Sequence, residues 1–129
     1  MKTLFISLLF IFFTQISSAN NAKYTVNGKE VKYRTLTNIN EIQKAYDIRM
    51  LLKKLSKDVS SCMDSGNTNN KCKCIHKEKN MELSSTIASA LKKYPHWLSA
   101  KALKVNFNGT KGILFVKSLQ KQARQKLQC

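Results

Sequence analysis

The chain has 129 residues, of which 43% are hydrophobic, and a formal net charge of +16 at pH 7. This length predicts one domain with a modest core and excludes a chain of several domains. The acidic residues all lie between Glu30 and Glu82, whereas residues 83–129 contain eight lysines and Arg124 but no carboxylate. Such an excess favours anionic partners. Because most of it is lysine, which lacks the planar fork of arginine, it favours diffuse attraction over sequence-specific recognition.

The first 19 residues predict a secretory signal peptide. Lys2 precedes an apolar run at residues 4–13, and the segment ends in Ser17-Ser18-Ala19, with small residues at the positions that signal peptidase reads. The apolar run is about half the roughly 20 residues that a membrane-spanning helix needs. We therefore expect cleavage after Ala19, no later transmembrane segment, and a secreted or periplasmic mature domain at residues 20–129. This location excludes cytosolic roles such as transcription or ribosome binding.

Residues 23–33 predict a β-hairpin. Asn27-Gly28 supplies the two residues that adopt positive φ in a tight turn, and β-branched and aromatic residues flank it. Because an isolated hairpin is only marginally stable, we expect it to dock on another element.

A long helix is predicted from about residue 38 to Cys62. Thr37 or Asn38 can cap its N-terminus, and Glu41 follows Asn38 at the spacing of a capping box. Apolar residues then recur every three or four positions up to Cys62. A glycine and a polar segment at residues 66–70 predict the end of the helix and a loop. Cys62 is therefore expected on the last turn, beside the buried face.

A second helix is predicted at about residues 78–94, with an apolar face formed by Met81, Ile87, Ala88 and Leu91. Pro95 marks a break, or the first turn of a short further helix through Leu98. We expect the aromatic residues of Tyr94-Pro95-His96-Trp97 to anchor this junction in the core.

The following segment has two interpretations. Apolar residues alternate at positions 103–107 before Asn108-Gly109, and a β-rich run follows at 113–116, which favours a second hairpin. The alternative is a helix that continues from residue 97 to residue 107. Asn108-Gly109-Thr110 also fits an N-glycosylation acceptor, which would require an exposed turn.

Residues 117–127 predict a terminal amphipathic helix. Leu119, Ala123 and Leu127 lie on one side, and basic residues occupy the rest. Such a helix can lie on an anionic lipid surface. The narrow apolar stripe and the closing Cys129 favour packing against its own domain instead.

The four cysteines, Cys62, Cys72, Cys74 and Cys129, form an even set, which predicts two disulfides in an oxidising compartment. A Cys72–Cys74 bond is the least expected, because one intervening residue strains the ring. Cys62 should therefore pair with one of these two cysteines and Cys129 with the other. The alternative is a zinc or copper site with His76 as a further ligand. We expect disulfides and no metal.

The strongest enzymatic alternative is a ribonuclease in which His76 and His96 act as general base and acid and a lysine stabilises the transition state. The sequence contains no Gly-x-Ser-x-Gly, no phosphate-binding glycine loop and no His-Glu-x-x-His. We therefore assign no catalytic residue and expect no cofactor.

Together these patterns predict a small disulfide-stapled α+β domain of about three helices with one or two short β-hairpins. Its expected function is non-enzymatic binding of an anionic partner, such as acidic polysaccharide, lipid headgroups or nucleic acid. A structural or inhibitory partner of another secreted protein is a further alternative. The expected contact residues lie in the basic C-terminal half: Lys92, Lys93, Lys101, Lys104, Lys111, Lys117, Lys121 and Arg124.

Overall fold

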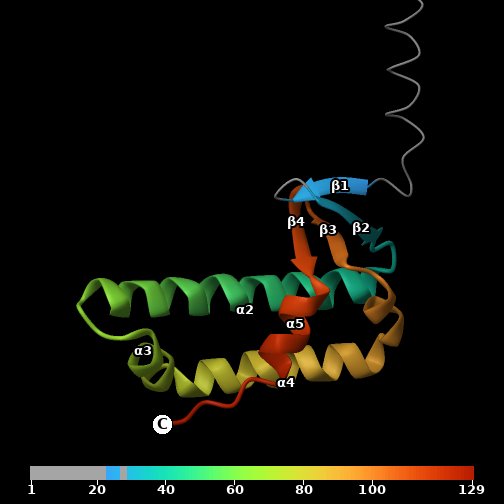
Figure 1. Ribbon diagram of the computed structural model, residues 1–129. Helices are drawn as coiled ribbons and strands as arrows, with labels where there is room; N and C mark the ends of the chain where they lie inside the picture. The colour runs from blue at the N-terminus through green and yellow to red at the C-terminus, as the bar shows by residue number, and fades with distance from the viewer. Residues whose placement is uncertain (1–22, 27–28) are drawn as a thin grey trace, which may run out of the picture.

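A computed structural model describes residues 23–26 and 29–129, which form the predicted α+β fold (Figure 1). The strands are β1 (Lys23–Val26), β2 (Lys29–Thr35), β3 (Ala102–Phe107) and β4 (Thr110–Phe115). The helices are α2 (Ile39–Asp64), α3 (Asn69–Ile75), α4 (Lys77–Lys93) and α5 (Val116–Ala123), with a 3-10 helix, η1 (Pro95–Ser99). The predicted signal peptide, residues 1–19, and the predicted turn at 27–28 lie outside the described residues.

The strands form one sheet in the order β1-β2-β3-β4. β1 and β2 pair antiparallel, as do β3 and β4, so both predicted hairpins are present. The end of β2 pairs parallel to β3, with Tyr33 opposite Ala102 and Thr35 opposite Lys104. Parallel neighbours need a long crossover, and residues 36–101, which include α2, α3, α4 and η1, provide it.

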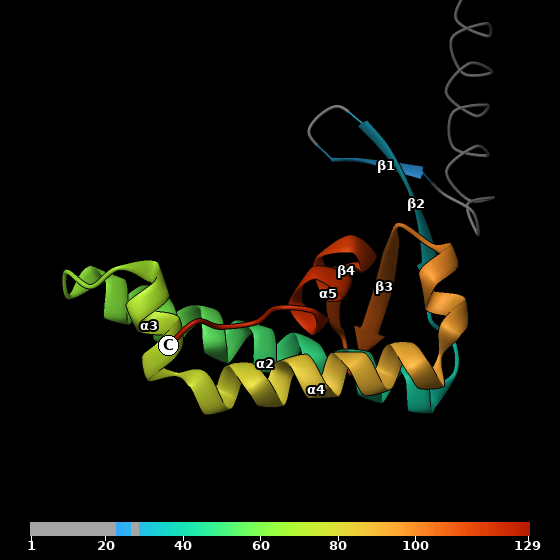
Figure 2. The ribbon, with the colours of Figure 1, turned by 60° about the horizontal axis from the view of Figure 1, so that its bottom comes forward.

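The two long helices, α2 and α4, run antiparallel and side by side, and the sheet lies over the N-terminal half of α2 (Figure 1 and Figure 2). α5 crosses from the end of β4 to α4. The core lies where the sheet and the helices meet. Its largest fully buried apolar side chains come from α2, α4, η1, β3 and α5: Ile48, Leu83, Ile87, Trp97, Leu103, Val105 and Leu119.

Half of the predicted capping box is present at the start of α2. The Asn38 side chain accepts hydrogen bonds from the backbone N–H groups of Asn40 and Glu41, at 2.9 and 3.3 Å. The Glu41 carboxylate, instead of completing the box, extends to η1 and contacts His96 and Trp97. The carboxylate that we predicted to cap α2 therefore ties the start of this helix to the junction after α4.

The predicted loop after α2 is only partly a loop. Gly66, with φ +91°, follows the end of α2 as expected. Three residues later α3 begins, and its N-terminus is capped by the Thr68 hydroxyl, which accepts from the Lys71 N–H at 3.3 Å. The sequence prediction was wrong here because a helix this short has too few turns to show an apolar period.

The second hairpin is confirmed and the helical alternative for residues 97–107 is wrong. Asn108 and Gly109 both adopt positive φ, at 47° and 79°, as the turn type of a two-residue hairpin requires. Pro95 begins the 3-10 helix η1, as the second interpretation of that junction proposed.

The terminal helix is shorter than predicted, since α5 ends at Ala123 and not at residue 127. The Ser84 hydroxyl of α4 donates to the carbonyl of Gln122 at 2.9 Å, and residues 124–129 continue outside the helix toward α3. There the Asn70 side-chain amide donates to the carbonyl of Gln128 at 3.4 Å. The last residues are thus held by α3 and α4 instead of by their own helical bonds.

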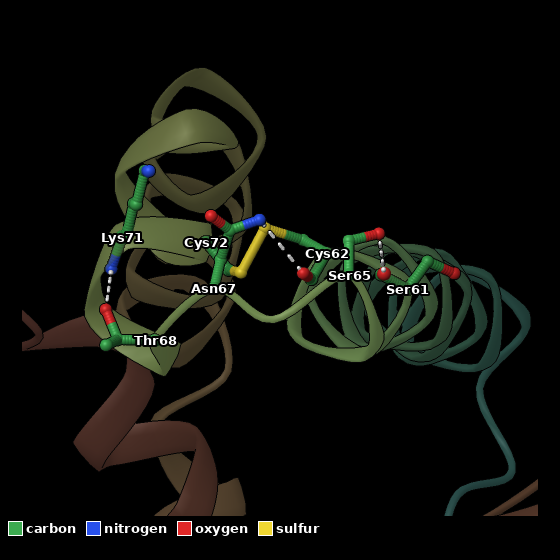
Figure 3. The surroundings of a disulfide bond; sticks show 7 residues. All are labelled: Ser61, Cys62, Ser65, Asn67, Thr68, Lys71 and Cys72. Atoms are coloured by element: carbon green, nitrogen blue, oxygen red, sulfur yellow. Dashed lines mark hydrogen bonds between the residues drawn. A yellow bond between two sulfur atoms is a disulfide. The ribbon is translucent and has the colours of Figure 1, made fainter.

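The two predicted disulfides are present, and of the two pairings left open the structure contains Cys62–Cys72 with Cys74–Cys129. The first joins the last turn of α2 to α3, and the Asn67 side-chain amide donates to the Cys62 carbonyl at 3.2 Å beside it (Figure 3). The second joins α3 to the C-terminal residue. Because all four cysteines are oxidised, the alternative metal site has no thiolate ligands.

Candidate anion-binding site

The eight basic residues predicted to bind anions are all exposed but do not form one surface cluster. They occupy the last turn of α4, the sheet with the residue before it, and the α5 segment: Lys92 and Lys93; Lys101, Lys104 and Lys111; and Lys117, Lys121 and Arg124. In the first two groups, one lysine each lies over an aromatic ring. The Lys93 ammonium is 5.6 Å from the centroid of Tyr94, and that of Lys104 is 5.7 Å from that of Tyr33.

The α5 group lines a depression of about 690 Å³, which we call the basic depression. Lys117 and Lys121 are four residues apart and therefore share a helix face, and Arg124 follows at the C-cap. Lys73 of α3 completes the set. The remaining lining residues carry hydroxyl and amide groups, and none of the described residues in the lining is acidic. Four cations therefore line one depression, and no carboxylate of the described residues lines it with them.

Lys73 was missed by the sequence reasoning because its position depends on the disulfides. It lies between Cys72 and Cys74, which bond to two different segments of the chain: the last turn of α2 and the C-terminal residue. The Cys74–Cys129 bond brings the segment after α5 beside α3, and this places Lys73 next to the α5 cations. The sequence signal that could have pointed to Lys73 is its position between two cysteines that bond to different partners.

Two electrostatic effects act on these side chains. Like charges at such proximity repel one another and attract anions. The C-terminal end of a helix carries a partial negative charge, which favours the cations at Lys121 and Arg124. The serine and glutamine side chains around them can donate hydrogen bonds to an anionic oxygen. The arrangement can therefore bind an anionic group.

The structure does not bring the two histidines of the ribonuclease alternative together. His76 lies at the N-terminus of α4 and His96 just beyond its C-terminus. At about 1.5 Å per residue, the 17 residues of α4 separate them by about 25 Å. His96 instead contacts the Glu41 carboxylate, which also accepts a 2.7 Å hydrogen bond from Nε1 of the buried Trp97. His96 therefore belongs to a structural cluster and not to an acid–base pair.

Residues 23–26 and 29–129 contain no group of three or more His, Cys, Asp or Glu side chains placed to hold a metal ion. In the same part of the chain, no helix combines the length and the apolar character needed to cross a bilayer. The two disulfides are compatible with an extracellular, oxidising location.

Comparison with protein-family models, curated proteins and solved structures finds no match to this chain.

Proposed function

We propose that this protein is a secreted or periplasmic, non-enzymatic protein that binds anionic partners through the basic depression. The observation that carries the proposal is the convergence of Lys73 with Lys117, Lys121 and Arg124 on one depression that no described acidic residue lines. The disulfides and the predicted signal peptide support the location, because such bonds persist in oxidising compartments.

The binding strength should come from the group and not from single pairs. An exposed ion pair contributes only about 0–1 kcal/mol, and salt screens it over roughly 8 Å at physiological ionic strength. Four cations fixed around one depression act together on a phosphate or carboxylate group. The Cys74–Cys129 disulfide and the bond from Ser84 to the Gln122 carbonyl hold the two sides of the depression in place, which lowers the ordering cost.

The proposal is tested by chromatography on a phosphate-bearing matrix with two double variants of equal charge. Lys117→Gln with Lys121→Gln removes two charges from the depression, whereas Lys53→Gln with Lys54→Gln removes two exposed charges from α2. We expect the first variant to elute at clearly lower salt than the wild type and the second to change little. Equal shifts in both would show attraction by net charge alone and would overturn the proposal.

A further inference from the structure

A second hollow, the α2–α4 cleft, lies beside the basic depression. Its volume is about 370 Å³, within the range of roughly 300–1,000 Å³ that is usual for small-molecule sites. α2, α3, α4, the last turn of α5 and the segment after it supply its walls. One wall is apolar and consists mainly of α2 side chains: Leu52, Leu55, Val59, Met63 and Leu83.

The cleft and the basic depression are contiguous, because Lys73, Gln122 and Gln125 line both. The apolar wall therefore leads directly to the converging cations. Its outer part is accessible, since the Met63 side chain is 43% exposed and Val59 is half-buried. Methionine is flexible and polarisable, which suits contact with ligands of irregular shape.

Asn80 gives a second, independent observation. It lines the cleft and is only 2% exposed. Its Oδ1 accepts a 2.6 Å hydrogen bond from Nε2 of Gln122, whereas its Nδ2 is buried without an acceptor among the described residues. Buried donors are rarely left unsatisfied, and each such case calls for an explanation. An oxygen atom of a ligand in the cleft would satisfy this donor.

From this geometry we infer that the protein binds a single-chain anionic amphiphile, meaning one alkyl or acyl chain that carries a phosphate or carboxylate group. The alkyl or acyl chain of the ligand lies along Leu52, Val59 and Met63. Its head group lies between Lys73 and the α5 cations. An inorganic anion would leave the apolar wall unused, and an uncharged lipid would leave the cations unused. The inference rests on the proposed function, because the basic depression supplies the head-group contacts.

The inference is tested by calorimetric titration of the disulfide-bonded protein with butyl phosphate, dodecyl phosphate and dodecyl maltoside, each below its micelle concentration. Each methylene that becomes buried should raise the affinity about fourfold. We expect dodecyl phosphate to bind at least about a hundredfold more tightly than butyl phosphate. We expect it to bind at least about tenfold more tightly than dodecyl maltoside.

A matched pair of α2 variants tests whether the alkyl chain of the ligand lies in the cleft. Met63→Glu and Ser61→Glu each add one negative charge at an exposed position near the end of α2, but only Met63 lines the cleft. Met63→Glu should weaken dodecyl phosphate binding at least about tenfold more than Ser61→Glu does. The two variants should affect butyl phosphate equally.

The outcomes separate the inference from the proposal on which it rests. Equal affinity for butyl and dodecyl phosphate would overturn the amphiphile inference and leave anion binding intact. Equal affinity for dodecyl phosphate and dodecyl maltoside would show that the head group is not recognised, which also overturns the inference. If neither phosphate binds and the matrix experiment shows equal shifts, the proposed function itself fails.

Discussion

Replacing Glu41 should destabilise the fold mainly through Trp97. The Trp97 side chain is fully buried, and its Nε1 donates to the Glu41 carboxylate at 2.7 Å. Glu41→Ala leaves this donor buried without an acceptor, which costs about 1–3 kcal/mol. Loss of the contact with the exposed His96 adds at most about 1 kcal/mol. We expect the free energy of unfolding to fall by about 1–4 kcal/mol, measured by urea denaturation with circular dichroism.

A double-mutant cycle isolates the buried bond. In a Trp97→Phe background the N–H group is absent, so adding Glu41→Ala should cost no more than about 1 kcal/mol. Glu41→Gln keeps an oxygen acceptor at the same reach and should cost less than Glu41→Ala in the wild-type background. If Glu41→Ala costs the same in both backgrounds, the bond to Trp97 contributes nothing and the reasoning is refuted.

Three further predictions concern the disulfides, the surface and the helix cap. Replacing Cys74 and Cys129 together by Ala opens a 55-residue loop and should lower the free energy of unfolding in urea by about 4 kcal/mol. Removing the other disulfide, which closes a 10-residue loop, should lower it by about 3 kcal/mol. A larger loss for the 10-residue loop would contradict this reasoning. The hydrogen bond from Lys79 holds the pKa of Asp58 below 3.8. The stabilisation of the fold by this bond is therefore complete above about pH 4 and is lost as the pH falls through the lowered pKa of Asp58. Lys79→Gln should move the Asp58 pKa back toward 3.8 in an NMR titration, and an unchanged value would show that Lys79 is not the cause. Asn38→Ala removes the cap of α2 and should cost about 1 kcal/mol by thermal unfolding, whereas Asn38→Asp should cost little.

The parts of the fold with local signals could be predicted from the sequence. The Asn108-Gly109 turn fixed the second hairpin, and the cap at Asn38 fixed the start of α2. The parallel pairing of β2 with β3 could not be predicted, because residues 36–101 separate the two strands and no local pattern reports their register. Helix α3 was missed because its stability depends on the Thr68 cap and on two disulfides instead of on an apolar face.

Only the part of the candidate site that has a local sequence signal could be predicted. The cations of α5 follow from charge and helical spacing, so Lys117 and Lys121 were identified beforehand. Lys73 and Asn80 were not, because each reaches the site through tertiary geometry. The Cys74–Cys129 disulfide holds Lys73 beside the segment after α5, and Asn80 is buried where Gln122 packs against it.

The parallel pairing of β2 with β3 also determines the order in which the molecule can fold. β2 leaves the ribosome long before β3, since the chain between them contains all of α2, α3, α4 and η1. Until β3 arrives, one edge of β2 has unpaired backbone groups that can join another chain. Non-local pairing of this kind is slow because loop closure must be completed first. We therefore expect the newly made chain to be vulnerable to aggregation until residues 102–115 have joined the sheet, and the β2–β3 pairing to form later than the two local hairpins.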